Sequence, residues 1–352
     1  MAVAAPLPAA VPLALSCRGP VIEAVHYGQI AAAWPSGEPA ASLGDAAAPV
    51  TLRSSAKPLQ ALAVVTSGAA DRFRFEPRHL ALACASHQGS ALHLGAVREM
   101  LARMELDESY LECGAHWPDD REERDRLIRA GEEPTAVHNN CSGKHAGMLA
   151  TALALGASPR GYLDPDYPVQ VLIRRHLALM SGVPEADLFP LLDGCGAPTY
   201  ALPLRSIACA FARLAQPEGL PAEVATAAGR ATAAMLAHPA LVQGRRSFNT
   251  ALLQEASGAV IAKGGAEGLF ALALTGPGLG IAVKVSDGSG RPWPPVVMAL
   301  LARQLTSVPP GPAAYVRPEQ TNCRGAVVGH LEATAAVADL LPTPLLSEEA
   351  CP

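Results

Sequence analysis

The sequence of 352 residues predicts an α/β (α+β) fold in which one sheet is built from both chain ends and the middle is mainly helical. Half of the residues are apolar, which is enough for a sizeable core. Strand-like runs lie near the start and towards the end of the chain, and helix-like periodicity fills the part between them. Strands from both ends that form one sheet, with helices packed on it, satisfy this order.

The elements follow from short patterns in chain order. β-Branched and apolar runs predict strands at residues 21–25, 30–33, 269–274 and 280–285, with Gly-Pro turns between the later ones. Apolar residues at helical spacing predict helices at residues 59–65, 92–104, 144–155, 169–180, 204–214, 222–237 and 296–305. We therefore expect a single domain over residues 15–340, a frayed or disordered tail at 1–14 and a loose tail at 341–352.

Charge and hydropathy exclude several classes of partner. The net charge is -5 and the isoelectric point is about 6.1, without a Lys/Arg cluster, so nucleic acid is not the expected partner. No uncharged apolar run reaches the ~20 residues of a membrane span. The first 14 residues lack the cationic start of a signal peptide. We expect a cytoplasmic protein that acts on a small molecule or peptide.

The eight cysteines are spread thinly along the chain, unlike the dense framework of a small secreted protein. We expect most of them to be reduced. Cys84 and Cys209 lie in apolar stretches and are interpreted as small buried side chains.

The run RSSAKP at residues 53–58 suggests an enzyme. It places Ser54 three residues before Lys57, a spacing that puts both side chains on one face of a helix. A serine hydroxyl needs a base to become a good nucleophile, and a lysine with a pKa lowered by burial can be that base.

Two more segments are rich in polar and small residues. The run CASHQG at residues 84–89 contains Ser86 and His87, although a serine before a helix is more often an N-cap. The run HNNCSGKHAG at residues 138–147 forms a turn that could present backbone N–H groups to an anion. It lacks the spacing of a phosphate-binding loop, so nucleotide binding is not expected.

Two last segments carry a thiol and an amine. The run DGCGAP at residues 193–198 is either a tight turn with a buried thiol or, with Cys195 close to Cys141, a pair of thiolates for zinc. The run IAKGGAEG at residues 261–268 places Lys263 on a strand that ends in glycines, as in penicillin-binding proteins and serine β-lactamases. A hairpin turn with an exposed lysine is the alternative.

Taken in order, these five runs resemble the class 3 L-asparaginases, the asparaginase II family of the rhizobial type, which is similar in fold to serine β-lactamases. The resemblance covers roughly residues 15–337. It implies hydrolysis of L-asparagine to L-aspartate and ammonia by two neighbouring Ser-Lys pairs. Those pairs would be Ser54 with Lys57 and Ser86 with Lys263.

The resemblance also implies a metal, typically zinc, held by Cys141, Lys144 and Cys195. Asp193 would lie beside it and position the substrate or a metal-bound water. Family members form dimers, so we expect a homodimer. Whether such a metal would be catalytic or structural is left open by the sequence.

The expected mechanism is acyl transfer. Ser54, deprotonated by Lys57, would attack the side-chain amide, while Ser86 and Lys263 relay protons or polarise the carbonyl. Arg53 either holds a substrate carboxylate or covers a surface, and it ranks with His145 and His87 as a secondary candidate for substrate binding.

Two other functions are compatible with the same residues. A β-lactamase or penicillin-binding-like hydrolase would use the same Ser-x-x-Lys and Lys-Gly elements, but the chain contains no Ser-Asp-Asn element. A non-catalytic metal-binding module would not need the two serines and two lysines.

Overall fold

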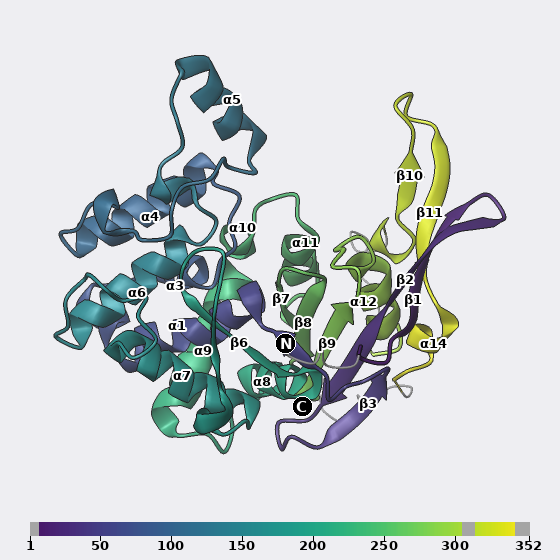
Figure 1. Ribbon diagram of the computed structural model, residues 1–352, viewed down its shortest axis with the longest axis horizontal. Coiled ribbons are helices and arrows are strands. Elements are labelled where there is room, and N and C mark those ends of the chain that lie inside the picture. Colours follow the sequence, from purple (N-terminus) through teal and green to yellow (C-terminus); the bar gives the residue numbers. More distant parts are fainter. Residues whose placement is uncertain (1–6, 305–313, 342–352) are drawn as a thin grey trace, which may run out of the picture.

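A computed structural model describes residues 7–304 and 314–341 of the chain. Its main sheet is antiparallel and has the order β10 (Glu319–Thr321), β11 (Val327–Ala333), β1 (Val11–Arg18), β2 (Val21–Ala33), β9 (Leu279–Val285), β8 (Leu269–Leu274) and β7 (Val260–Gly264). Strand β3 (Pro39–Leu43) also pairs with β2. The sheet is thus built from both chain ends, which confirms the predicted arrangement (Figure 1).

The middle of the chain is mainly helical. It contains α1 (Lys57–Thr66), α2 (Ala69–Arg72), α3 (Pro77–Ala83), α4 (Ala91–Arg103), α5 (Arg121–Ala130), α6 (Ser142–Ala154), α7 (Pro168–Ser181), α8 (Leu204–Ala215), α9 (Ala222–Ala237), α10 (Pro239–Val242) and α11 (Phe248–Glu255). A small second sheet has the order β4 (Pro49–Thr51), β6 (Pro198–Pro203) and β5 (Pro190–Leu192). Helices α12 (Trp293–Leu301) and α14 (Ala335–Ala338) follow near the end of the chain.

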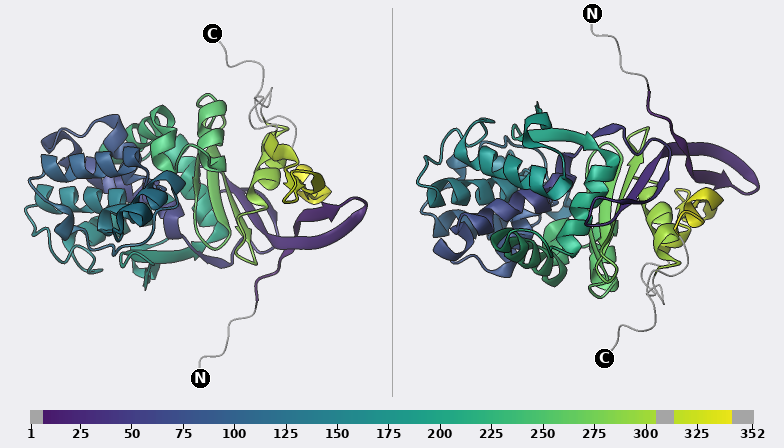
Figure 2. Two further views of the ribbon diagram at one scale, coloured as in Figure 1. Left: turned by 90° about the horizontal axis from the view of Figure 1, so that it is seen from above. Right: turned by 90° about the horizontal axis from the view of Figure 1, so that it is seen from below.

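Strands β7, β8 and β9 of the main sheet are buried on both faces, and strand alternation separates two cores. Along β8, Ala271 and Ala273 belong to the core shared with the helical middle, whereas Leu272 and Leu274 belong to the core shared with α12. The sheet lies between the helical middle on one side and α12 with α14 on the other (Figure 2). Small side chains on the first face let α8 approach closely: a Cβ at Gly280 would lie 1.9 Å from the carbonyl oxygen of Ala208.

The structure corrects the predicted start of the domain. Residues 11–14, expected in a frayed tail, belong to β1, where Leu13 and Ala14 are fully buried against the sheet core. Val11, Pro12 and Ala14 pair with β2, and from Ala14 onwards β1 also pairs with β11, far along the chain, which a local pattern does not reveal. Residues 1–6 and 342–352 of the two predicted tails lie outside the described residues.

Most predicted elements coincide with observed ones. The two strands expected at residues 21–25 and 30–33 are one long strand, β2, because pairing with β1 and then β9 supports it along its length. The helix expected at 296–305 is α12, which ends at Leu301, while residue 305 lies outside the described residues. The seven cysteines in the described ranges form no disulfide, as expected. Within those ranges, no helix has the length and apolar character needed to cross a membrane.

Candidate active site

Ser86 lies between two buried lysines. Its Oγ accepts a hydrogen bond from Lys57 Nζ over 2.8 Å and another from Lys263 Nζ over 2.9 Å. Ser86 follows α3 and is partly exposed, whereas both lysines are fully buried. A hydroxyl has one proton, so it can donate to one neutral amine while it accepts from the other. This arrangement joins the two lysines into one proton-exchanging unit.

Burial disfavours the charged form of both lysines. The pKa of Lys263 is lowered well below its ordinary value, first by burial and then by the charge of Lys57. Burial also lowers the pKa of Lys57; the nearby Cys141 thiolate opposes this effect and Lys144 adds to it. A lysine with such a pKa is available as a base near neutral pH.

Strand alternation brings Lys263 to this place. Lys263 lies two residues after Ile261 on β7, on the face that packs against the helical middle. Its Nζ also donates to the carbonyl oxygen of Gly264 over 2.7 Å, and its own carbonyl accepts from Ser55 Oγ over 3.1 Å. Ser55 therefore ties the segment that carries Ser54 to the strand that carries Lys263.

The expected pairing of Ser54 with Lys57 is replaced by the pairing of Lys57 with Ser86. Ser54 lies in the short 3-10 helix Arg53–Ala56, which runs directly into α1 with Lys57 as its first residue. Within the described chain, no hydrogen bond joins the side chains of Ser54 and Lys57. Ser54 is partly exposed. The predicted pairing of Ser86 with Lys263 is present, with Lys57 as a second partner.

The predicted metal ligands lie together. Cys141 is the N-cap residue of α6 and Lys144 is in its first turn, while Cys195 comes from the turn before β6. Lys144 Nζ donates to Cys195 Sγ over 3.0 Å, and all three residues are buried. Gly143 allows α6 to lie against α3, because a Cβ there would be 2.5 Å from the carbonyl oxygen of Leu82.

The two thiols share one proton. The Cys195 thiol hydrogen-bonds to Cys141, which holds the pKa of Cys141 well below its usual value despite burial, and both Lys57 and Lys144 add to this effect. The same pairing raises the pKa of Cys195. Burial would lower the pKa of Lys144, but the negative sulfurs of Cys141 and Cys195 raise it instead. The charge states of Cys141, Cys195 and Lys144 are therefore coupled to one another.

Arg53 and Asp193 form an ion pair next to Ser54. Arg53 Nε donates to Asp193 Oδ1 over 2.6 Å, and the backbone N–H of Gly194 donates to the same oxygen over 2.9 Å. Burial raises the pKa of Asp193, but Lys144, this N–H group and Arg53 together hold it below its usual value. Arg53 also has a φ of 45°, an unusual value for a residue other than glycine. The ion pair and the hydrogen bond from Arg53 N to Thr199 Oγ1 hold the segment in this conformation.

His145 is placed differently from the other predicted site residues. It is fully buried, and its Nδ1 lies 2.8 Å from the hydroxyl of Tyr162. Burial, followed by the charges of Lys144 and Lys57, lowers its pKa well below the ordinary value, so the ring is neutral. It follows Lys144 in α6, and we interpret it as a residue that supports this helix.

The sequence interpretation missed one contributor to the site, Asn140. Its carbonyl oxygen accepts from Lys57 Nζ over 3.5 Å and from His87 N over 3.1 Å, and its Oδ1 accepts from Cys141 Sγ over 3.1 Å. Asn140 thus links the Ser-Lys unit to the thiol cluster. Its place in the polar run at residues 138–147 suggested that it lies near the site, but every residue has a backbone carbonyl group, so the sequence does not show which of them will make a contact there.

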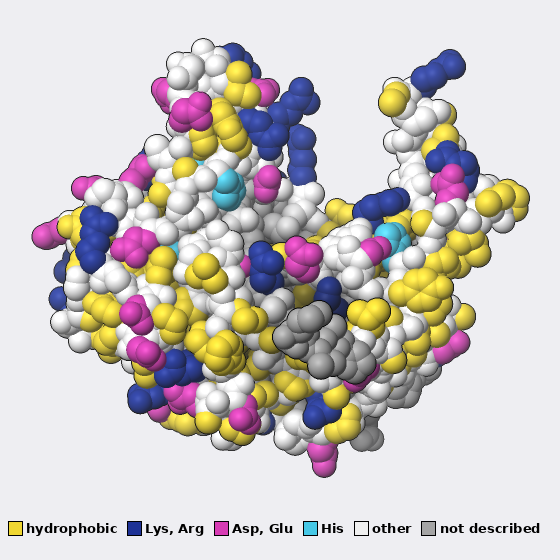
Figure 3. Space-filling view, in the orientation of Figure 1, with side chains coloured by type: hydrophobic (Ala, Val, Ile, Leu, Met, Phe, Trp, Pro, Cys, Tyr) yellow, Lys and Arg dark blue, Asp and Glu magenta, His cyan; other side chains and the backbone are white. Residues whose placement is uncertain are grey.

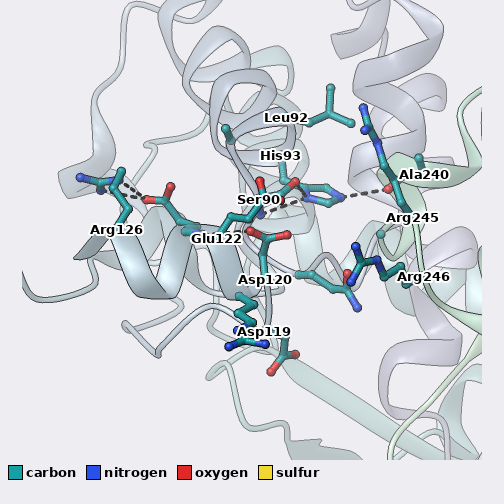
Figure 4. A pocket seen from close by; sticks show the side chains of 15 residues that line it. Ser90, Leu92, His93, Asp119, Asp120, Glu122, Arg126, Ala240, Arg245 and Arg246 are labelled. Atoms are coloured by element: carbon teal, nitrogen blue, oxygen red, sulfur yellow. Dashed lines mark hydrogen bonds and ion pairs between the residues drawn. The ribbon is translucent and has the colours of Figure 1, made fainter. Parts of the chain in front are cut away.

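A cavity of about 750 Å³ is lined by residues that include Gln88, Ser90 and His93. Asp119 and Asp120 lie on one side of it and Arg245 and Arg246 on the other (Figure 4). Viewed as in Figure 3, the molecule is hollowed between the part that carries α5 and the arm of β10 and β11. The lining of this cavity does not include the predicted site residues.

Comparison with known proteins places the chain in a family. The family described as L-asparaginase II matches residues 14–333, which is most of the chain. No curated protein matches the chain significantly in sequence. Among solved structures, a β-lactamase from Mycobacterium bovis is similar over 78% of this chain and 94% of its own, with 17% identity and a TM-score of 0.42, a level too low to assign a fold or a function. On the strength of the family match, the chain belongs to the L-asparaginase II family and is an asparaginase-type amidohydrolase.

Proposed function

We propose that the chain hydrolyses L-asparagine to L-aspartate and ammonia through an acyl-enzyme on Ser54. The observation that carries this proposal is the position of Ser86 Oγ between the Nζ atoms of Lys57 and Lys263. Two amines joined by one hydroxyl can take a proton at one point and release it at another, which amide hydrolysis requires.

The reaction has two halves. Ser54 Oγ forms a bond to the side-chain amide carbon and its proton passes to Lys57, while Ser86 hands a proton to the departing nitrogen. The carbon–nitrogen bond breaks and ammonia leaves. Water then attacks the ester and gives a proton to Lys57. Lys57 returns this proton to Ser54 Oγ as the bond between Ser54 and the acyl group breaks, and L-aspartate is released.

The proposal gives Ser54 and Ser86 different roles. Ser86, which hydrogen-bonds to both lysines, moves protons between them, and Ser54 attacks the substrate. Ser54 is partly exposed and precedes Lys57 by one helical turn. Its hydroxyl has no hydrogen-bond partner within the described chain and can turn towards a substrate.

Arg53 and Asp193 are suited to the two charged groups of an amino acid. The Arg53 guanidinium uses its Nε on Asp193, which leaves its two terminal nitrogens for the substrate α-carboxylate. Asp193 remains ionised at neutral pH because its pKa is held low, and it can accept a hydrogen bond from the α-ammonium group. This pair would select a free amino acid over a peptide.

Cys141, Lys144 and Cys195 fit a zinc ion. Two sulfur donors and one nitrogen donor, buried together, are a donor set that zinc accepts once the thiols and the Lys144 ammonium group have given up their protons, which the charge of the ion favours. When bound there, zinc would supply a positive charge that orients a polar substrate group. Asp193 Oδ2, 4.0 Å from Cys195 Sγ, lies between this cluster and Arg53 and would hold the substrate between them.

Ammonia release by the purified full-length chain tests the function. L-Asparagine should give stoichiometric ammonia and L-aspartate, and L-glutamine and a β-lactam serve as parallel substrates. No ammonia from L-asparagine, with or without added zinc, would overturn the proposal. Rapid opening of the β-lactam in the same experiment would instead favour the β-lactamase-like hydrolase.

Metal analysis tests the zinc ligands. Wild type and the double variant Cys141→Ser/Cys195→Ser are equilibrated with zinc, dialysed and analysed for bound metal. The double variant should retain one equivalent less than wild type. Equal zinc content in two folded proteins would remove these residues from metal binding.

The homodimer and the cytoplasmic location stay predictions. Light scattering over a dilution series would test the first: a constant mass of twice the 36.2 kDa chain is expected, and a monomer at every concentration would contradict it.

A further inference from the structure

Strands β1 and β11 bring together three donor side chains away from the active site. Cys17 on β1 pairs directly with His330 on β11, and Glu332 lies two residues further along β11 on the same face of the sheet. The thiol, imidazole and carboxylate donor atoms all lie within 4.8 Å of one another. In Figure 1 this part of the sheet is on the opposite side of the molecule from α6.

The separations are within a few tenths of an ångström of those in a tetrahedral zinc site. Cys17 Sγ lies 3.9 Å from Glu332 Oε1, and His330 Nε2 lies 3.2 Å from Glu332 Oε2. Zinc–ligand bonds of about 2.0–2.3 Å imply ligand–ligand separations of about 3.3–3.7 Å. Small side-chain rotations therefore bring the three donors onto one ion, without a change in the strand pairing.

A cation already lies against two members of this cluster. Arg317 Nη2 lies 2.6 Å from His330 Nε2, and Arg317 Nε lies 3.2 Å from Glu332 Oε2. A guanidinium group can only donate, so its contact with His330 requires a lone pair on Nε2, and a metal ligand needs the same lone pair. The side chain of Arg317 is 61% exposed and can move into solvent.

We infer that Cys17, His330 and Glu332 form a second zinc site, in which the ion replaces the Arg317 guanidinium. Zinc binding removes the thiol proton of Cys17, and water takes the fourth position. The site joins the first strand of the sheet to the last described one, residues 315 apart in sequence. An ion that binds there only in the folded chain stabilises that fold.

Cobalt titration of the full-length protein tests this site, because a thiolate on Co²⁺ gives a charge-transfer band in the near ultraviolet. Wild type is compared with Cys17→Ser and with Cys323→Ser, a control that removes an exposed thiol from the turn between β10 and β11. Cys17→Ser should lose one equivalent of the band, and Cys323→Ser should lose none. An unchanged titration of folded Cys17→Ser would overturn the inference.

Two further variants keep the test decisive if Cys17→Ser does not fold. Glu332→Gln, at a partly exposed position, should weaken binding by more than the about 100-fold typical of changes outside a ligand set. Arg317→Ala should tighten binding about tenfold, because the competing cation is gone. If the cluster is only an ion pair, Arg317→Ala will destabilise the chain without any gain in metal affinity, and that result would also overturn the inference.

Zinc should also raise the thermal unfolding midpoint of wild type and of Cys141→Ser/Cys195→Ser, but raise it less in Cys17→Ser. A rise that depends only on Cys141 and Cys195 would assign all the bound zinc to the active-site cluster and contradict the second site.

Discussion

The Nζ atom of Lys57 donates a hydrogen bond to Ser86 Oγ over 2.8 Å, although the two residues lie 29 positions apart in the sequence. Lys57 is the first residue of α1, and Ser86 follows the end of α3. Because Lys263 binds the same oxygen from β7, the hydroxyl connects the helical middle to the main sheet. The proposed chemistry depends on this connection.

Ser86→Ala should lower kcat by about 10²–10⁴-fold, the usual contribution of a positioned proton donor or acceptor. KM should change little, since Ser86 is not proposed to bind the charged groups of the substrate. Ammonia release under saturating L-asparagine measures the effect, and Ser158→Ala on the surface is the matched control. Full activity of Ser86→Ala would show that the two lysines work without it.

The pH profile of kcat/KM should remain high at neutral pH and fall on the acid side. Burial lowers the pKa of Lys263, and the charge of Lys57 lowers it further. The amine of Lys263 is therefore neutral at pH values well below about 10.4, the pKa of a free lysine. Activity that needs the neutral amine is lost as the pH falls through that lowered pKa. A rise in activity only near pH 10 would mean that the lysines titrate normally.

Arg53→Ala should raise KM for L-asparagine by about 10–100-fold, the loss expected for a charge-assisted hydrogen bond. Its effect on kcat should be smaller. Arg205→Ala, an exposed arginine in α8, is the matched control. A large loss of kcat with an unchanged KM would show instead that Arg53 acts by holding the segment around Ser54.

The free energy of unfolding should decrease as the pH falls from about 6.5 towards 4. His176 on α7 is buried and lies 3.3 Å from Thr66 Oγ1, and burial lowers its pKa to about 4 from an ordinary value of 6.5. Between these two values the unfolded chain binds a proton that the folded chain does not, so acid favours unfolding.

His176→Gln removes this titration and keeps a polar group for Thr66. Urea unfolding at several pH values should then show a dependence weaker by up to about 1.4 kcal/mol per pH unit. The same dependence in wild type and His176→Gln would show that His176 is not the group responsible.

The sequence predicts the architecture well where the pattern is local. Strand β8 and helix α9 have the bounds that hydrophobic periodicity predicts, because apolar side chains pack in the same way along the whole length of each element. Strand β1 was missed because its apolar run sits in an alanine- and proline-rich start, and only pairing with β2 and β11 stabilises it.

The sequence pointed to residue types that the fold brings together, but it did not indicate the hydrogen-bond partner that Lys57 has in the structure. The motifs select Ser54, Lys57, Ser86 and Lys263, and the fold brings Lys57, Ser86 and Lys263 into contact. Spacing suggested that Lys57 pairs with Ser54, but a lysine side chain is long enough to reach a neighbouring helix. Which serine it meets is decided by the packing of α1 against α3.

The acylated residue tests the central claim most directly. The full-length enzyme is mixed with L-asparagine, quenched with acid within one turnover, digested and analysed by mass spectrometry, with Ser54→Ala and Ser86→Ala alongside. We predict an aspartyl ester on Ser54 in wild type, no ester and no ammonia release in folded Ser54→Ala, and slow but detectable acylation in Ser86→Ala. An ester on Ser86, or continued turnover by Ser54→Ala, would contradict the account.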